Sequence, residues 1–502
     1  MESLQEKYPP QISYPSPERG PLSTRRTVTI KPSTGTKVAG ASTSDIVQFK
    51  LPNTGVLASC YLKGRVKVGT ISAGTGTAAH TFAATRVVQD PFAPAASWIR
   101  RMVVKTSDGT EVTNVNNYHR YCSIKARLQN DEGYSENQGS ILENTPTLNG
   151  AAVQGGFNAA ELSADAMVVG AAPISFAADH KDASKRVARA FAANNSLDFV
   201  HEFQAGILAA NKNKDFFLPL ALMGSGMSLE LTCAEKEEVF RAVAPDTTVF
   251  SANPLDQIVR PGAGADSYEL QDLELVCDLL FMDPQIMSSL ASEMCSGLKV
   301  VVDNVRQQQT PVTQQSNTII LNQHARSVRA VIGGIKNTSD AANSLVDESE
   351  YYVRPADGSS ALSKIQFSVG AENVPSNPIT YGPQSYKELS KAFKGIVGDE
   401  FELGNQVRYQ DYHKAYKSRD AAAGSGGAGA RPGSALFGIN LRQHPEMPEV
   451  VSGKSASAGS ISMSMELEFD GGTGLAAAMV ETFIISDSVV ELLADGGALV
   501  SK

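Results

Sequence analysis

The side chains most able to catalyse reactions or bind metals are scattered through this 502-residue chain. None of its histidines forms a His-x-His pair, which a cupin-type metal site would need on one strand. The sequence also lacks the Gly-x-Ser-x-Gly, His-Glu-x-x-His and P-loop patterns. The isolated histidines are His80, His119, His180, His201, His324, His413 and His444. We therefore predict no catalytic, cofactor-binding or metal-binding residues.

Two local patterns resemble parts of active sites. The Gly-Ser-Gly stretch at 224–226 lies in an expected turn with no helix after it, so turn geometry explains its glycines. Asp272, Glu274 and Asp278 share one strand at a spacing typical of its solvated or subunit-facing side. A glycosidase would need a second carboxylate opposite them. Because none is identified, the sequence predicts a protein that is not an enzyme.

The five cysteines show no Cys-x-x-Cys spacing. Cys233 and Cys277 lie in apolar, strand-like runs, where a buried free thiol is expected rather than a disulfide or a metal ligand. The other three are Cys60, Cys122 and Cys295. The odd number, together with an N-terminus that lacks the apolar core of a secretory signal, predicts folding in a reducing intracellular compartment.

The composition restricts the class of protein. A chain of 502 residues predicts two domains of about 200–250 residues each. The net charge of −9 opposes a main surface for nucleic acid, and we expect no sequence-specific nucleic-acid binding. No apolar run reaches the roughly 18 residues of a transmembrane helix.

Residues 1–44 are rich in Pro, Ser, Thr and Gly, and predict an extended N-terminal arm. Six basic and three acidic residues give this arm a net charge of +3 (6 − 3). A basic arm on an acidic body could contact an anionic surface or a neighbouring subunit. The alternative is a solvated tail.

Apolar alternation predicts strands through the first half of the chain, at 45–50, 57–68, 97–104, 197–203, 216–223, 227–233 and 268–283. The turn at 106–109 predicts a hairpin, and 114–128 predicts a helix. Residues 130–195 form a long insertion, which in a compact β-protein is typically an interaction surface.

A seam between two β-domains is expected at 284–297. Pro284 suits the first turn of a helix, apolar residues recur at helical spacing after it, and Gly297 suits its C-terminal cap. A β-branched run then begins at 298–302. The pattern predicts a linker helix between two units.

The second half repeats the order of the first, with strands expected at 298–302, 317–322, 325–335, 364–370, 435–441, 461–469 and 482–493. A helix is expected at 384–393, in the place of the first helix, and a flexible loop at 420–434. About eight strands per unit favour the jelly roll. The prediction is an all-β chain of two consecutive eight-stranded jelly rolls with short helices and long loops, at 45–283 and 298–502.

Several stretches carry a family resemblance. Residues 216–234 (FFLPLALMGSGMSLELTCA) and 268–284 (YELQDLELVCDLLFMDP) resemble the end of the first jelly roll in double jelly-roll major capsid proteins of the PRD1–adenovirus lineage. The resemblance is to members from nucleocytoplasmic large DNA viruses, virophages and polinton-like viruses. Residues 365–393 are similar to the second-domain stretch, and 437–469 and 495–500 resemble the closing strands.

The resemblance implies a major capsid protein whose homotrimers form pseudo-hexameric capsomers in the icosahedral shell of a DNA virus. It implies assembly inside the host cell and localisation in the virion. The partners would be neighbouring capsomers, penton and minor capsid proteins, with an internal membrane possible at the basic arm 1–44. The insertion 130–195 and the loop 420–434 become candidates for an exposed tower or for contacts between subunits.

The alternative is a non-enzymatic β-sandwich attachment or carbohydrate-binding protein. Such a protein predicts clustered exposed aromatic residues and a calcium-binding loop. Trp98 is the only tryptophan, with core packing its expected role, and no Asp-x-Asp-x-Asp-Gly loop occurs. The capsid interpretation is therefore favoured.

Overall fold

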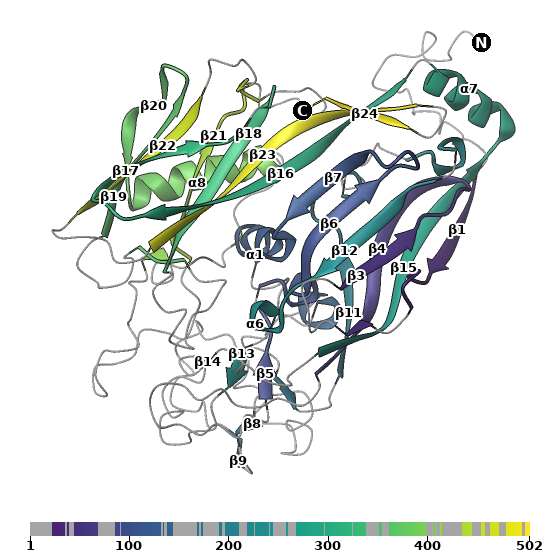
Figure 1. Cartoon of the computed structure of the whole chain (residues 1–502), viewed down its shortest axis with the longest axis horizontal. Coiled ribbons are helices and arrows are strands. Elements are labelled where there is room, and N and C mark those ends of the chain that lie inside the picture. The colour runs from purple at the N-terminus through teal and green to yellow at the C-terminus, as the bar shows by residue number, and fades with distance from the viewer. Residues whose placement is uncertain are drawn as a thin grey trace, which may run out of the picture.

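The computed structural model shows two β-sandwiches side by side, each made of two antiparallel sheets (Figure 1). One helix, α7 (Pro284–Cys295), connects them along the chain. The structure describes residues 23–35, 38–39, 45–68, 86–90, 92–131, 134, 138–143, 168–169, 172–173, 190–192, 196–209, 218–224, 226–239, 241–243, 258–259, 268–295, 297–323, 325–337, 351–353, 361–397, 404, 407, 412–413, 434–443, 453–456, 462–470, 478–493 and 497–501.

The first sandwich has the strand order of a jelly roll. Its strands are β1 (Ser23–Ile30), β3 (Ile46–Lys50), β4 (Val56–Val68), β6 (Ile99–Lys105), β7 (Glu111–Asn116), β11 (Ser196–Glu202), β12 (Ser228–Cys233) and β15 (Tyr268–Met282). One sheet has the order β1-β15-β4-β11, and the sheet facing it has the order β3-β12-β6-β7. First and last strands are therefore neighbours, as are second and seventh, which is the pairing of a rolled antiparallel ribbon.

The second sandwich repeats this order. Its strands are β16 (Leu298–Val312), β17 (Ser316–Leu321), β18 (Val328–Asn337), β19 (Ala361–Val369), β20 (Glu372–Thr380), β21 (Leu436–Asn440), β22 (Met463–Asp470) and β23 (Ala478–Leu492). The sheets have the orders β16-β23-β18-β21 and β17-β22-β19-β20, with β24 (Ala498–Ser501) added beside β23. The prediction of two consecutive eight-stranded jelly rolls is confirmed.

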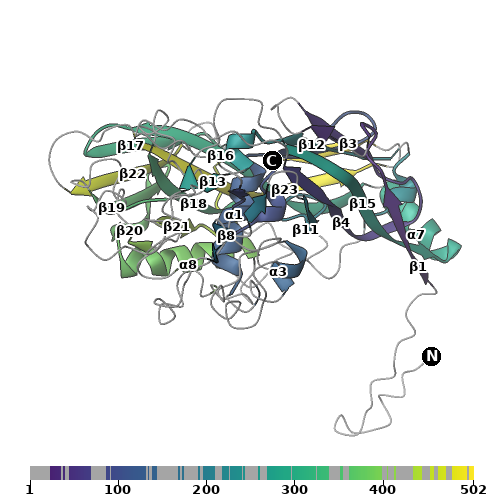
Figure 2. The ribbon, with the colours of Figure 1, turned by 90° about the horizontal axis from the view of Figure 1, so that it is seen from below.

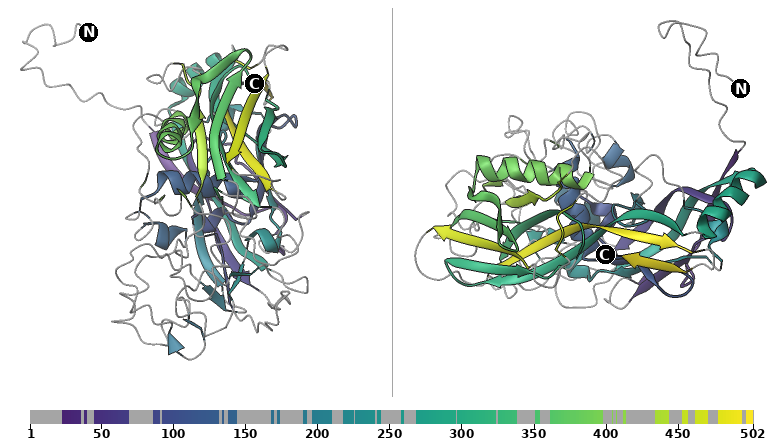
Figure 3. Two further views of the ribbon diagram at one scale, coloured as in Figure 1. Left: turned by 90° about the vertical axis from the view of Figure 1, so that its left-hand side faces the viewer. Right: turned by 90° about the horizontal axis from the view of Figure 1, so that it is seen from above.

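Each jelly roll carries a helix at the same place in the chain. Helix α1 (Tyr118–Gln129) follows the fifth strand of the first roll, and α8 (Pro383–Val397) follows the fifth strand of the second. Figures 2 and 3 show α8 lying along one side of the second roll. The repeated position supports an origin of the two units by duplication.

A small accessory sheet gathers connections of the first roll. Its order is β10 (Ala190–Ala192), β5 (Arg86–Val88), β13 (Arg241–Val243) and β14 (Ile258–Val259). Strand β5 comes from the connection between β4 and β6, β10 from the segment before β11, and β13 and β14 from the connection between β12 and β15. These connections meet at the end of the roll opposite α7, because Val68 pairs with Tyr268 and Ser196 with Lys67. Other short elements are β2 (Val38–Ala39), β8 (Val168–Val169), β9 (Ala172–Pro173), η2 (Pro94–Ala96), α3 (Gln138–Leu142), η4 (Leu220–Leu222) and α6 (Lys236–Val239).

The cores follow from strand alternation. In β22, Met463, Met465, Leu467 and Phe469 are buried while the residues between them are half-buried or exposed. These four side chains fill the space between the two sheets of the second roll. Trp98 is fully buried and its ring lies 6.1 Å from that of Phe199, so its expected role in core packing is confirmed.

Part of the predicted arm belongs to the first roll. Strand β1 lies within 1–44 and pairs antiparallel with β15 along its whole length, from Ser23 opposite Met282 to Ile30 opposite Leu275. Val28 and Ile30 pack on the core, and Thr27 Oγ1 donates a hydrogen bond to Asp278. The prediction of an extended arm is therefore wrong for 23–30, where a short β-branched run outweighs the polar composition.

Two further predictions are corrected. Residues 216–223 do not form a continuous strand: Leu218 makes an isolated bridge to Leu57, and 220–222 form a 3₁₀-helix. Pro219 between them cannot donate to a ladder. The helix predicted at 114–128 begins at Tyr118, because 111–116 form β7 of the expected hairpin.

Of the insertion 130–195 and the loop 420–434, most residues lie outside the described part of the chain.

Candidate functional site

The described histidines occupy separate structural positions. The Nδ1 atom of His119 lies 3.3 Å from the carbonyl oxygen of Ile99, and the Nε2 atom of His201 lies 3.0 Å from the Tyr118 hydroxyl. The ring of His413 packs edge-on against that of Tyr412. Within the described ranges, no group of three or more His, Cys, Asp or Glu side chains could hold a metal ion. The remaining predicted positions, His80, His180, His324 and His444, lie outside those ranges.

The acidic residues of β15 connect strands. Glu274 forms an ion pair with Lys63 of β4 at 2.7 Å. Asp278 accepts hydrogen bonds from Arg25 and Thr27 of β1. Although burial acts to raise it, the pKa of Asp278 is lowered by these hydrogen bonds. Glu274 and Asp278 therefore lie on the outer side of the strand, as predicted, and bind it to neighbouring strands. Asp272 is exposed at a bulge, where its φ of 52° interrupts the regular strand.

Among the residues that the structure describes, an extensive polar arrangement lies at the junction of the two rolls. Helix α1 of the first roll packs against the outer face of the β16-β23-β18-β21 sheet of the second. The rings of Tyr121 and Phe483 lie 6.1 Å apart across this junction. A cavity of about 10 Å³ remains between α1, Ile332 and Phe393, which is room for about one water molecule. The junction is closely packed.

Glu481 of β23 is the central charge of this junction. Its side chain is fully buried. Its Oε1 atom accepts hydrogen bonds from Arg120 Nη1 at 3.0 Å, Gln307 Nε2 at 2.7 Å and Gln309 Nε2 at 3.1 Å. Arg120 belongs to α1, whereas both glutamines belong to β16. One carboxylate oxygen thus joins the two rolls.

The other oxygen of Glu481 is held within the second roll. Its Oε2 atom accepts a hydrogen bond from the Tyr351 hydroxyl at 2.8 Å and lies 2.9 Å from Lys336 Nζ. Burial acts to raise the pKa of Glu481, but Lys336 and Arg120 hold it well below its usual value. Glu481 is therefore ionised in the folded protein.

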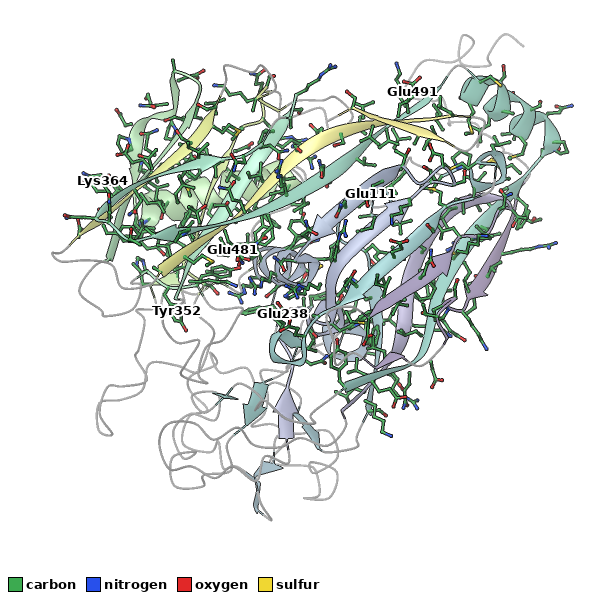
Figure 4. The ribbon with its side chains drawn as sticks, viewed as in Figure 1. Glu111, Glu238, Tyr352, Lys364, Glu481 and Glu491 are labelled. Carbon is green, nitrogen blue, oxygen red and sulfur yellow. The ribbon has the colours of Figure 1, made fainter. Side chains whose placement is uncertain are left out.

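Arg120 bridges carboxylates of both rolls. Its Nη2 atom lies 3.9 Å from Glu238 Oε1 of α6 in the first roll, while Nη1 binds Glu481 of the second. Figure 4 shows Glu238 and Glu481 near each other beside helix α1. Asn117 adds a hydrogen bond of 2.9 Å from its Nδ2 atom to Gln307 Oε1. The junction is thus defined by directional bonds as well as by packing.

A second buried charge lies beside this network. Arg329 of β18 binds Asp303 of β16 and lies 3.0 Å from Asp487 of β23. Ser327 donates a hydrogen bond of 2.6 Å to Asp487. Burial acts to lower the pKa of Arg329, but the two carboxylates raise it above its usual value. This ion triad connects three strands of the sheet on which α1 packs.

Arg127, on the same helix, is also fully buried. Its guanidinium lies 4.1 Å from the centre of the Phe92 ring and 5.5 Å from that of Tyr351. Phe92 belongs to the first roll and Tyr351 to the second. Cation–π contacts of this kind favour one orientation of the planar guanidinium. Helix α1 therefore contacts the second roll through both ends.

This arrangement orients two domains. A buried ion pair stabilises a protein weakly at best against an apolar replacement, but its geometry can select one packing arrangement over others. Here five donors converge on one carboxylate from α1, β16, β18 and the segment at 351–353. We regard the junction as the candidate functional site, because it sets how the two rolls are presented.

Sequence patterns did not predict the residues of this junction. Glu481 and Asp487 lie in β23, where nearly every residue is buried because both faces of the strand are covered. A charged residue inside such an apolar run is a signal of a buried pair. The partners of Glu481, which are Arg120 and Lys336, and the partner of Asp487, which is Arg329, are remote in sequence and carry no local signal.

Comparison with known proteins identifies the fold. No protein-family model matches the sequence, and no curated protein matches it. Among solved structures, the Faustovirus major capsid protein matches with a TM-score of 0.54 at 9% identity, covering 97% of this chain and 93% of that one. The PBCV-1 virus capsid structure gives a TM-score of 0.53 at 10% identity, covering 96% and 98%. The Sputnik virophage structure gives 0.50 at 10% identity, covering 100% and 92%.

The fold is the double jelly roll of these capsid structures. At these identities the likeness establishes the fold, and the double jelly roll extends over nearly the whole chain. The fold expected from the resemblance of short stretches is thereby confirmed. Among the residues that the structure describes, no helix has the length and apolar character needed to cross a membrane.

Proposed function

We propose that this chain is a major capsid protein, which trimerises into pseudo-hexameric capsomers and tiles the icosahedral shell of a DNA virus. The observation that carries the proposal is the pair of jelly rolls of identical strand order, joined by the buried network around Glu481. The structures with the same fold include a major capsid protein and a virus capsid. The proposal assigns no catalytic residue.

The geometry suits a hexagonal lattice. Two similar units held side by side in one chain become six similar units when three chains surround a threefold axis. Such a trimer has nearly hexagonal contacts although its true symmetry is threefold. A fixed angle between the rolls is required, because any variation in that angle would spoil the fit between neighbouring capsomers.

The ends of the first roll differ in a way that suggests its orientation. Helix α7, strand β24 and the start of β1 lie at one end (Figure 1), while the connections that build the accessory sheet lie at the other. We assign the α7 end to the inside of the shell and the accessory end to the outer tower, with 130–195 contributing to it. The loop 420–434 would form part of the tower or contact a neighbouring subunit.

The partners follow from that orientation. Neighbouring capsomers would contact the sides of the rolls, and penton and minor capsid proteins would contact trimers at special positions of the shell. The basic N-terminal arm, 1–44, would lie on the inner side near minor proteins or an internal membrane, with its residues 23–30 held in the first roll as β1. The acidic charge of the whole chain is consistent with no sequence-specific binding of nucleic acid.

Native mass measurement of the purified chain tests trimerisation. The chain has a mass of 53.2 kDa, so a trimer has about 160 kDa (3 × 53.2). We expect this species to predominate and to persist on dilution. A stable monomer that binds immobilised glycans would instead support a carbohydrate-binding attachment protein.

A further inference from the structure

Two free cysteines face each other across neighbouring strands of the first roll. Cys60 of β4 and Cys277 of β15 are direct partners in the antiparallel register. Directly opposed residues in such a pair have Cα atoms about 4.5–5.5 Å apart and side chains on the same face. A disulfide requires Cα atoms about 4.4–6.8 Å apart. The register thus meets the main geometric requirement for a cross-strand disulfide.

Both thiols point into the core between the two sheets. Cys277 is fully buried and Cys60 is 7% exposed, and both belong to the core cluster of the first roll. None of the other three cysteines lies opposite a cysteine on a neighbouring strand. Cys233 lies opposite Ile99, Cys122 lies on α1, and Cys295 is exposed on α7. The pair is therefore distinguished by position from the other three thiols.

We propose that Cys60 and Cys277 are a redox modification site, which forms a disulfide when the folded protein meets a small oxidant such as hydrogen peroxide. The bond would join β4 and β15, the two inner strands of the β1-β15-β4-β11 sheet. A reduced pair suits synthesis in a reducing compartment, and an oxidised pair suits a stable particle outside it.

The reaction proceeds in two steps. The thiolate of one cysteine of the pair attacks one oxygen of hydrogen peroxide, the O–O bond breaks, and that cysteine becomes a sulfenic acid while the other oxygen leaves and takes up the thiol proton as water. The sulfur of the second cysteine then attacks the sulfur of the sulfenic acid, the S–O bond breaks, and the hydroxyl leaves with the second thiol proton as a second water. The two thiols lose two electrons, which the peroxide gains.

The surroundings set the rate. Both thiols are shielded from solvent, since Cys60 is 7% exposed and Cys277 is not exposed. Burial raises the pKa of Cys277 to about 12 and that of Cys60 well above its usual value, so little thiolate is present at neutral pH. Oxidation is therefore slower than at the exposed Cys295.

Peptide mapping of the full chain tests the proposal. The purified protein is treated with hydrogen peroxide, its remaining thiols are alkylated in denaturant, and its peptides are analysed without reduction. We expect the peptides of Cys60 and Cys277 to be joined, with a loss of about two mass units, and the joined species to disappear on treatment with dithiothreitol. Cys122 and Cys233 should remain alkylated.

Two variants add an independent readout. In Cys277→Ala the sulfenic acid of Cys60 has no partner, so it should be captured by a dione reagent that the unaltered chain does not incorporate at Cys60. The matched control Cys233→Ala removes a buried thiol outside the pair and should retain the Cys60–Cys277 bond. The proposal fails if Cys60 and Cys277 are both fully alkylated after Cys295 has been oxidised, or if Cys60 is joined to another cysteine.

Discussion

Glu481 shows how one residue can fix the relation of two domains. Its carboxylate is inaccessible to water, yet it accepts bonds from α1 of one roll and from β16 and β18 of the other. Desolvating this charge is unfavourable. Four of the donors that offset the cost belong to the second roll, and the fifth, Arg120, reaches the carboxylate only when the rolls are in this orientation. The network therefore contributes orientation more than raw stability.

Replacement of Glu481 by Gln tests whether the buried donors depend on this carboxylate. Arg120 and Lys336 would then face a neutral amide in a buried site, and we expect the free energy of unfolding to fall by about 3–5 kcal/mol. Chemical denaturation at neutral pH measures the change. The matched control is Glu468→Gln, since Glu468 pairs with Lys364 at 2.8 Å on the surface and its loss should change stability little.

The contribution of Glu481 should depend on pH. Its pKa in the folded protein lies well below the ordinary value of 4.5, so its stabilising contribution is complete above about pH 4.5 and is lost as the pH falls toward the folded-state pKa. The difference in unfolding free energy between the unaltered chain and Glu481→Gln should accordingly shrink in acid. A difference that grows as the pH falls below 4.5 would contradict the assignment.

At the scale of single residues, sequence patterns have limited reach here. They correctly placed Trp98 and Cys277 in the core, because both lie in apolar strand-like runs. They did not identify the bond between Arg120 and Glu481, which are separated by 361 positions. Only the packing of α1 on the second roll brings these two side chains together.

At the scale of elements, strand periodicity and duplication predicted most of the architecture. The two jelly rolls, the helix after the fifth strand of each and the hairpin at 106–109 all follow from local patterns. Two strands, β1 and β20, were not predicted, and each has a physical reason. β1 is a mostly exposed edge strand with little apolar signal, and β20 carries prolines that a sheet accepts only at its edge.

Truncation tests the role of β1. Removal of 1–30 would expose the edge of β15 and remove the packing of Val28 and Ile30, so we expect the melting temperature to fall by about 5 °C or more and the chain to associate through the open edge. Differential scanning calorimetry and light scattering measure these effects.

The matched control for this truncation is removal of 1–22, which leaves β1 complete. It should melt close to the unaltered chain and remain dispersed. Equal behaviour of the two truncated chains would show that the pairing of β1 with β15 contributes little.

At the scale of the whole molecule, the two rolls share one continuous core. The cluster that fills the first roll extends through α1 to the outer face of the second roll, where Phe483 and Phe393 belong to it. The sheet that contains β23 is thus covered on both faces. Continuity of this kind predicts a chain that presents its two rolls as one rigid body.

Electron cryomicroscopy of the purified chain tests the capsid account most directly. Viewed along the threefold axis, the particle should have a nearly hexagonal outline with six lobes, in which the two rolls of each chain occupy neighbouring lobes at the angle fixed by Arg120 and Glu481. Particles with one or two chains, or with rolls at variable angles, would contradict it.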